Sequence, residues 1–220
     1  MLAGHVAVAF AGKRIEPRIS LGTWMVGALL ADLLAFVFLI SGLEQFTAVP
    51  GVTSNRFVGH IPYSHSLAMD ALWATLFAAG VYIAKRPRRA AWLLFGGVLS
   101  HWILDVISHR PDMPLAPGMS MVLGFGLWNS LPATLLCEGG AWLLATILYV
   151  RVTKANTRPA AVGFWAGTAL ITLIWVANIR SGIDPNPVRA GISGLVVFSA
   201  MIAWAYRMNR ARTYFNTSSI

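Results

Sequence analysis

One stretch decides how this chain folds, and it reads GVLSHWILDVISHRPDMPL, residues 97–115. It closes a long apolar segment, yet it carries His101, Asp105 and His109 at intervals of four residues. On an α-helix this spacing places the three side chains near one face, about 6 Å of rise apart per step. The prolines that follow cannot continue the helix, so the polar face ends in a loop that begins at Arg110. A His, Asp and His face inside an apolar segment predicts a functional site.

The composition of the whole chain predicts a membrane protein. Of its 220 residues, 57% are hydrophobic and only 11% are charged, whereas soluble domains carry about 25% charged residues. The net charge of +9 could indicate nucleic-acid binding, but the basic residues are scattered over short loops. Membrane topology explains that distribution better, so we expect no nucleic-acid partner. The single Cys137 excludes a disulfide framework within the chain.

Hydrophobic segments long enough to cross a bilayer recur along the sequence. The predicted spans are residues 21–43, 66–84, 90–109, 131–150, 160–179 and 190–206. Residues 1–12 are apolar but too short to span, so they predict a buried half-helix or a re-entrant segment. We therefore expect an all-α, polytopic membrane bundle of about six transmembrane helices plus a short N-terminal half-helix. It would form a single membrane domain, residues 1–220, composed of a site region (1–115), the remaining spans (116–206) and a basic tail (207–220).

The distribution of basic residues predicts the orientation of this bundle. If residues 13–18 are cytoplasmic, six spans place segments 85–89, 151–158 and 207–212 on the same side. That side then holds thirteen of the seventeen Lys and Arg residues. Because cytoplasmic loops are enriched in Lys and Arg, we expect both termini to be cytoplasmic.

Half of the eight acidic residues fall inside predicted spans. They are Asp32, Asp70, Asp105 and Glu138. An ionisable residue at membrane depth is costly and normally faces the bundle interior with a partner. At about 1.5 Å of rise per residue, Asp32, His101, Asp105 and Glu138 reach similar depths in the bilayer, while His109 lies near its outer edge. We therefore expect the helix over 90–109 to supply two ligands, with His109 at an outer lip beside Arg110 and Asp112.

Metal binding explains this gathering of carboxylates and imidazoles. Both are natural ligands of zinc and similar divalent ions. One or two such cations would neutralise carboxylates that could not otherwise be buried in ionised form. A site of His and carboxylate ligands without sulfur is typical of hydrolytic centres, where the metal lowers the pKa of bound water and polarises the substrate.

Four short motifs resemble, in order, those of the LexA-regulated, inner-membrane-associated metal-dependent hydrolases. The motifs are Gly4-His5, Leu29-Leu30-Ala31-Asp32, HIPYSHSL (residues 60–67) and GVLSHWILD (residues 97–105). The resemblance covers roughly residues 1–115 and implies a bacterial inner-membrane location and metal-dependent hydrolysis. It also implies Glu138 as a further ligand. Where the family often has Pro-Asp-x-Asp, this chain lacks the second carboxylate, and Ile61-Pro62 follows His60 where the family often has Arg-Gly.

The helix around His101 and Asp105 also resembles the metal-binding helix of zinc-dependent phospholipases C, which are all-α and hydrolyse phosphoesters. We therefore predict hydrolysis of a phosphoester in a membrane lipid or lipid-linked substrate, because a site in the outer half of the bilayer meets head groups first. The predicted ligands are His5, Asp32, His65, His101, Asp105 and Glu138. The predicted catalytic residues are His101, Asp105 and Arg110. Asp70 would not bind the metal but would orient one of its ligands.

Two other functions remain open from the sequence. Membrane Asp and His residues also form proton relays and ion paths, which would make the protein a proton- or ion-coupled transporter. That reading predicts pH-dependent flux without a metal requirement, although the sequence lacks the internal repeat common in transporters. Alternatively the polar residues only join helices in a non-catalytic scaffold, in which case Asp105→Asn would cost stability but no activity.

Overall fold

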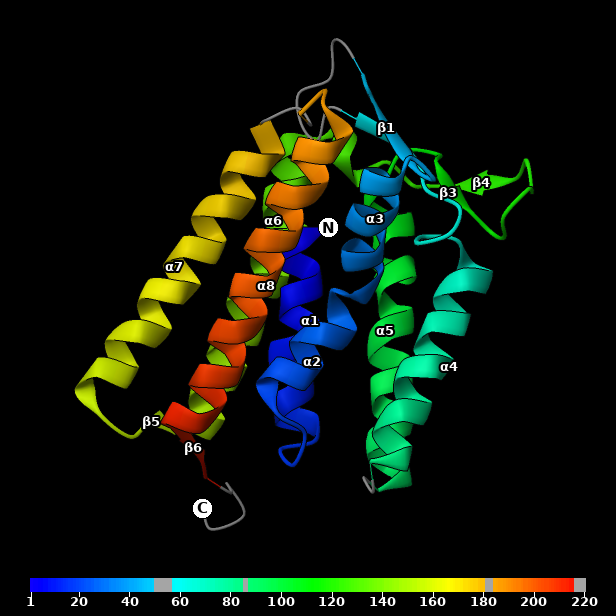
Figure 1. Ribbon diagram of the computed structural model, residues 1–220. Coiled ribbons are helices and arrows are strands. Elements are labelled where there is room, and N and C mark those ends of the chain that lie inside the picture. Colours follow the sequence, from blue (N-terminus) through cyan, green and yellow to red (C-terminus); the bar gives the residue numbers. More distant parts are fainter. Residues whose placement is uncertain (50–56, 85–86, 181–183, 216–220) are drawn as a thin grey trace.

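The computed structural model describes residues 1–49, 57–84, 87–180 and 184–215, and these residues form a bundle of eight helices (Figure 1). The helices are α1 (Leu2–Ile15), α2 (Leu21–Ala28), α3 (Leu30–Ser41), α4 (Leu67–Ile83), α5 (Arg88–Ser108), α6 (Leu131–Val152), α7 (Arg158–Arg180) and α8 (Pro187–Ala211), with a 3-10 turn, η1 (Leu127–Asn129), before α6. The antiparallel strand pairs are β1 (Gln45–Ala48) with β2 (Phe57–His60), β3 (Met113–Pro114) with β4 (Val122–Leu123), and β5 (Thr153–Ala155) with β6 (Arg212–Tyr214). The chain is therefore mostly helical, as the sequence predicts.

Four of the described helices, α5 to α8, are long and apolar enough to cross a membrane. The pair α2 and α3 makes a fifth span if the two count as one. Helix α4 is apolar, but its 17 residues rise only about 26 Å, less than the hydrocarbon core of about 30 Å. The predicted count of six spans is therefore not confirmed.

The segment predicted as one continuous span, residues 21–43, is broken instead. Helices α2 and α3 meet at Leu29 with a bend of 52°. The last carbonyls of a helix have no partner within it, so at membrane depth a break requires another donor. The carbonyl oxygen of Ala28 accepts that hydrogen bond from Nδ1 of His101, over 2.8 Å. The break also places Asp32 in the first turn of α3, where the helix dipole favours a negative charge.

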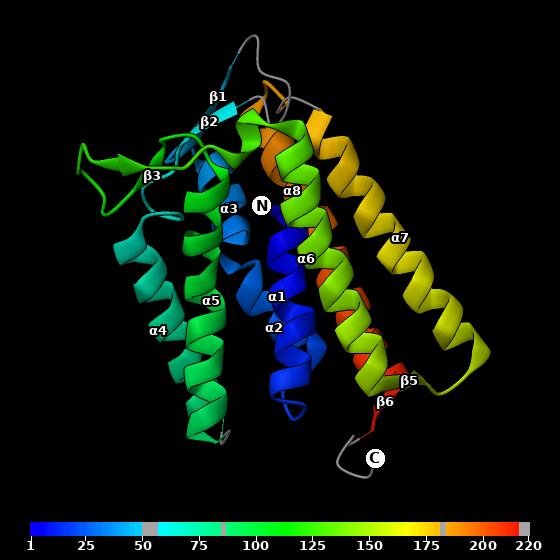
Figure 2. The ribbon, with the colours of Figure 1, turned by 180° about the vertical axis from the view of Figure 1, so that it is seen from behind.

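Helix α1 forms the centre of the bundle, and the view from behind shows it between α5 and α6 (Figure 2). Residues Ala3, Val6, Ala9 and Phe10 are completely buried, as expected of a helix that is apolar all round. A Cβ atom on Gly12 would lie 2.5 Å from the Trp24 indole, so α1 and α2 pack closely only because this residue is glycine. The predicted half-helix is therefore a core element.

The direction of α1 differs from the prediction that both termini lie at one side. The Met1 amino nitrogen lies 2.9 Å from Asp105 Oδ1, near the end of α5. Helix α1 runs from there toward the end of the bundle where α8 finishes (Figure 1). The first residue is thus inside the bundle, beside the polar cluster, because its apolar neighbours are buried there.

The two ends of the bundle differ in character (Figure 1). The lower end in that view holds the basic residues that finish α1, α6 and α8 and begin α5 and α7. The upper end holds the pairs β1–β2 and β3–β4. Of the predicted basic segments, Lys85 and Arg86 lie outside the described residues. The described ones share one end, as predicted.

Glu16 joins the end of α1 to the start of α5 at the basic end. Its carboxylate accepts a hydrogen bond from Arg18 Nε over 2.7 Å and lies 3.6 Å from Arg89 Nε. The hydrogen bond with Arg18, together with the charges of Arg18 and Arg89, lowers the pKa of the Glu16 carboxyl below its usual 4.5.

We therefore expect Glu16 to stabilise the fold above the unfolded-state pKa and to lose this contribution as the pH falls through the lower folded-state pKa. The midpoint of thermal unfolding should differ between wild type and Glu16→Gln near about pH 7, and the difference should shrink near about pH 3. A difference that stays constant across this range would contradict the assignment.

Candidate metal centre

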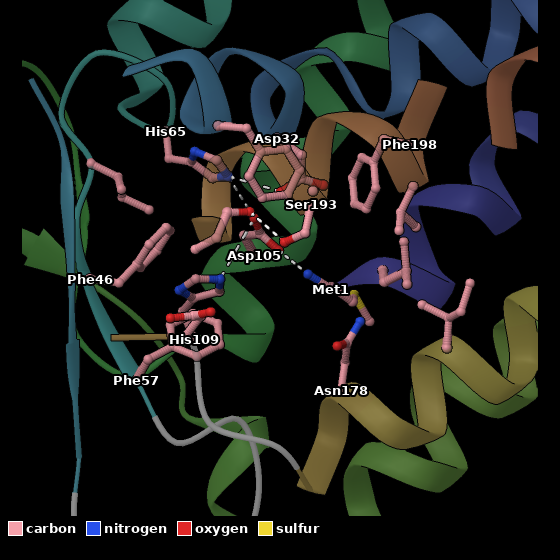
Figure 3. A pocket seen from close by; sticks show the side chains of 18 of the residues that line it. Met1, Asp32, Phe46, Phe57, His65, Asp105, His109, Asn178, Ser193 and Phe198 are labelled. Atoms are coloured by element: carbon pink, nitrogen blue, oxygen red, sulfur yellow. Dashed lines mark hydrogen bonds and ion pairs between the residues drawn. The ribbon is translucent and has the colours of Figure 1, made fainter. Parts of the chain in front are cut away.

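The face of α5 that carries His101, Asp105 and His109 points into the bundle. His101 Nε2 lies 3.2 Å and His109 Nε2 lies 3.8 Å from the same atom, Asp105 Oδ2. The prediction of His109 at an outer lip is wrong, because its side chain is only 5% exposed and faces Asp105 (Figure 3). Helix α5 ends at Ser108, and the extended backbone of His109 turns the ring inward. The helix therefore brings three polar side chains to the cluster, not two.

Two other elements complete the cluster. His65, in the turn before α4, has Nε2 at 3.3 Å from His101 Nε2 and at 3.6 Å from Asp105 Oδ2. Asp32 Oδ1 lies 3.6 Å from His65 Nε2 and 3.8 Å from His101 Nε2. Ligand atoms around a tetrahedral zinc ion lie about 3.3 Å apart, given bond lengths of about 2.0–2.1 Å. The spacing of these atoms therefore fits a divalent cation.

Each of the three histidines is held through its other ring nitrogen. His101 Nδ1 donates to the Ala28 carbonyl, which can only accept. His109 Nδ1 donates over 3.0 Å to the carboxylate of Asp112, whose second oxygen accepts from the backbone N–H of Gly59. A neutral imidazole with a proton on Nδ1 has a lone pair on Nε2, so these partners assign the tautomer that binds metal. Both Nε2 atoms face the cluster.

His65 receives the same support through a chain of two residues. The Ser64 hydroxyl donates to Glu44 Oε2 over 2.6 Å, so its oxygen accepts from His65 Nδ1 over 2.7 Å. The other oxygen of Glu44 accepts the backbone N–H groups of Tyr63 and Ser64. Glu44 is 2% exposed. We did not predict Glu44, Ser64 or Asp112 as functional residues of this kind; Ser64 adjoins His65 in sequence, but Glu44 is brought near only by the turn after α3.

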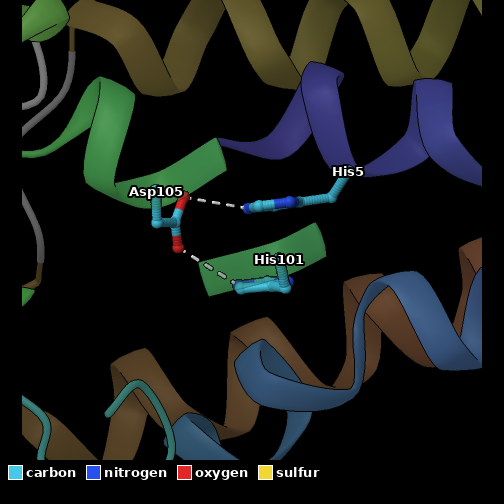
Figure 4. A group of neighbouring side chains, drawn as sticks. All are labelled: His5, His101 and Asp105. Atoms are coloured by element: carbon cyan, nitrogen blue, oxygen red, sulfur yellow. Dashed lines mark hydrogen bonds and ion pairs between the residues drawn. The ribbon is translucent and has the colours of Figure 1, made fainter. Parts of the chain in front are cut away.

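His5 reaches the opposite oxygen of Asp105 (Figure 4). Its Nε2 lies 3.0 Å from Asp105 Oδ1, and its ring stacks on His101 with centroids 3.6 Å apart. Within the described residues, the buried His5 Nδ1 has no hydrogen-bond partner. His5, His101 and Asp105 form one group with ligand-like spacing, and Asp32, His65 and His101 form another. Asp105 therefore faces both groups, one with each oxygen.

Glu138 is buried but is not brought to the cluster. Its two carboxylate oxygens accept the indole N–H groups of Trp128, over 2.8 Å, and Trp175, over 2.9 Å. Equal depth in the bilayer therefore did not mean proximity, and the prediction of Glu138 as a ligand is not supported by this arrangement.

We expect Glu138→Gln to destabilise the protein and to leave its metal content unchanged. An amide has one acceptor oxygen, so one buried indole N–H loses its partner, at a cost of about 1–3 kcal/mol. A lower midpoint of thermal unfolding with unaltered metal stoichiometry checks this. Cys137→Ser, at the exposed neighbouring position, is the control and should change little. If the Glu138→Gln variant lost its metal, Glu138 would again be a candidate ligand.

Three other residues singled out from the sequence, His60, Asp70 and Arg110, lie outside the cluster. His60 is exposed on β2. Asp70 is completely buried on α4, and among the described residues neither of its oxygens has a hydrogen-bond partner, so it does not orient a ligand by hydrogen bonding. Arg110 is half-buried, and its Nη2 lies 3.5 Å from the carbonyl of Trp128.

A cavity of about 320 Å³ opens beside the cluster (Figure 3). Asp32, His65, Asp105 and His109 form one of its walls. The other walls are largely apolar and come from the start of α1, from α3, α7, α8 and η1, and from the β1–β2 pair, with the Met1 amino group beside Asp105. The cluster is thus accessible from an apolar chamber inside the bundle.

Comparison with known proteins identifies one family. A family model described as YdjM inner membrane protein matches residues 1–182. No curated protein and no solved structure matches the chain.

Proposed function

The chain belongs to the YdjM inner membrane protein family, and from this premise we propose that it is a membrane-embedded, metal-dependent hydrolase. Its substrate would be a phosphoester of a membrane lipid or lipid-linked molecule. Family membership supports the location in the inner membrane. The activity, the metal and the substrate are the proposal, as is the LexA regulation implied by the sequence resemblance.

One observation carries the proposal. His65 Nε2 and His101 Nε2 lie 3.3 Å apart, and in the neutral form of each ring the Nδ1 partner leaves the lone pair on Nε2. Two lone pairs facing each other at this distance repel unless a cation lies between them. Asp32 and Asp105 supply negative charge at the same place. This arrangement favours a divalent cation held by His65, His101, His109, Asp32 and Asp105.

A divalent ion bound there would polarise a phosphoester and lower the pKa of a bound water molecule. The residues of the chain would do the remaining work. Asp105 would bind the cation through Oδ2, while His5 donates to Oδ1 and holds the carboxylate in place. In a two-ion site, His5 would be a ligand of the second ion. Glu44 and Ser64, Ala28 and Asp112 would keep the three histidines in the tautomer that coordinates.

The location of the cluster supports a lipid substrate. The basic end of the bundle favours a cytoplasmic position, which would direct the cluster and the strand pairs toward the opposite leaflet. A substrate there would be a lipid or lipid-linked molecule with its phosphoester near the membrane surface. Arg110, next to His109, remains our candidate for holding a phosphate oxygen by paired hydrogen bonds.

Removal of metal should abolish activity. We expect the protein purified in detergent to contain one or two equivalents of zinc or a similar ion and to hydrolyse lipid phosphoesters in vesicles. Treatment with a chelator should remove both the metal and the activity, and added zinc should restore them.

His60→Ala is the matched control, because His60 is exposed and lies outside the cluster. It should retain metal and activity, whereas His101→Ala should lose both. Negligible metal in the wild-type protein, or activity that survives the chelator, would overturn the proposal. A shared proton in place of the metal, as in a proton-coupled transporter, would give the first of these results.

A further inference from the structure

We propose that the cavity beside the cluster binds the hydrocarbon chain of a single-chain lipid phosphoester, which enters from the bilayer between α7 and α8. This inference rests on the proposed function and specifies its substrate.

The mouth lies near one end of α7 and α8. Three polar residues that line the cavity there, Asn178, Asp184 and Ser193, are exposed. Asn178 is two residues from the end of α7, and Ser193 is six residues from the start of α8, so they lie about 3 Å and about 9 Å from these helix ends. Both helices are candidate membrane spans. Polar groups at this depth suit the head-group region of a bilayer, where a lipid would enter sideways.

The wall that α8 contributes follows one stripe of the helix. Ala190 lines the cavity together with Ser193, Gly194 and Val197, which follow it by three, four and seven residues and so share its face of the helix. The small side chains of Ala190 and Ser193 leave room in the cavity, and at Gly194 the ring of Phe36 packs where a Cβ atom would lie. From Ala190 to Phe198 the helix rises about 12 Å, so the wall is elongated along the direction of a lipid chain.

The side of the cavity at Phe36 and Phe198 is aromatic. Phe198 is buried, with 7% exposure, and its ring packs edge to face against Phe36 with centroids 5.1 Å apart. Ser193 and Phe198 line the cavity on the side away from Phe46 and Phe57 in Figure 3. A chain whose phosphoester lies at Asp105 would therefore end against Phe36 and Phe198.

The chemistry of the lining selects the ligand. Among the described residues that line the cavity there is no Lys or Arg side chain, and the one amino group on its wall, that of Met1, is already paired with Asp105 Oδ1 over 2.9 Å, so no unpaired Lys, Arg or amino group is left to attract a second anionic group. An apolar chamber is costly to leave empty, and water makes few hydrogen bonds to such walls. The volume of about 320 Å³ is at the low end for ligand pockets, which favours one chain over two.

The first test maps the chain in the full-length protein in phosphatidylcholine vesicles. The probe is dodecyl phosphate with a photoreactive diazirine at the end of its chain. We expect the crosslinks, located by mass spectrometry, on Phe36 and around Val197 and Phe198. Crosslinks confined to outward-facing residues such as Leu173, which is 66% exposed, would overturn the proposal. This measurement does not require hydrolysis.

The second test measures chain-length preference with hexyl, decyl and tetradecyl p-nitrophenyl phosphodiesters. Phe198→Ala should shift the ratio of kcat/KM values toward the tetradecyl ester by about tenfold or more, and Ser193→Leu should shift it toward the hexyl ester. Phe125→Ala, at a position that is 79% exposed, should leave the ratio unchanged. Phe198→Leu, which removes less core volume, replaces Phe198→Ala if that variant does not fold.

The outcomes separate this inference from the proposed function. Unchanged chain-length preference in both cavity variants, with normal metal content and activity, overturns the chain site and leaves the hydrolase. Crosslinks on α8 in a protein that cleaves none of the esters support the chain site and overturn the hydrolase.

Discussion

Asp105→Asn should remove the bound metal and reduce the rate of hydrolysis by more than about 100-fold. Mutation of a residue that only hydrogen-bonds to a metal ligand already lowers metal affinity or activity by about 10–100-fold, and Asp105 is itself a proposed ligand. The two oxygens of Asp105 face different partners, with His65, His101 and His109 near Oδ2 and His5 near Oδ1. Asparagine has nearly the same shape but no charge, and its amide would direct an N–H group at one of these sets. Metal analysis and vesicle assays on the same preparation measure both effects.

Asp70→Asn provides the matched control for this substitution. Asp70 is also a buried aspartate of a helix inside the bundle, but within the described residues it has no hydrogen-bond partner. It should keep its metal and its activity. If Asp105→Asn bound as much metal as the wild type and lost only thermal stability, the cluster would be structural, as in a scaffold.

Glu44→Gln should weaken metal binding by about 10–100-fold although the residue does not reach the cluster. Ionised Glu44 can only accept, so Ser64 donates to it and must accept from His65 Nδ1. A glutamine amide can donate to the Ser64 oxygen, which frees the hydroxyl to donate to His65 Nδ1. The proton of His65 would then move to Nε2, and that nitrogen could no longer bind a cation. Competition of the purified protein with a zinc-chelating dye measures the affinity.

Ser64→Ala should have an effect of similar size, and the double variant should be little worse than either single one, because the two residues act in one chain. Ser66→Ala is the control. Its hydroxyl caps α4 by accepting from the backbone N–H of Met69, so its loss should cost about 1 kcal/mol of stability without weakening metal binding. If the losses of metal affinity in the Glu44 and Ser64 variants were additive, the two residues would not act through one hydrogen-bonded chain to His65.

The α5 face illustrates what local periodicity can predict. The spacing of His101, Asp105 and His109 predicted a shared helix face, and the three side chains do meet. The depth estimate that placed His109 at an outer lip, and so excluded it from the ligands, was wrong because it took the end of the helix as the membrane surface. In the structure the loop after α5 returns across this end: the backbone N–H groups of Phe125 and Gly126 donate to the carbonyls of Val106 and His109.

Glu138 and Glu44 show the opposite limit. Depth along a helix gives one coordinate, while proximity also requires the rotation of each helix about its axis. Glu138 has the expected depth but points toward Trp128 and Trp175. Glu44 follows α3 in a turn that no hydrophobic period describes, and its role depends on the contact with Ser64, 20 residues later.

The sequence alone predicts a helical membrane protein, basic segments that share one end, and His and Asp residues from several segments that enter the bundle. Composition and periodicity suffice for these conclusions because they depend on transfer of side chains between water and lipid. The central position of α1, the break of the first long apolar segment at Leu29 and the contacts between polar groups become visible only in the folded bundle. Those features depend on packing between segments. The free carbonyl group of Ala28 and the imidazole of His101, for example, can form their hydrogen bond only when α2 and α5 lie side by side.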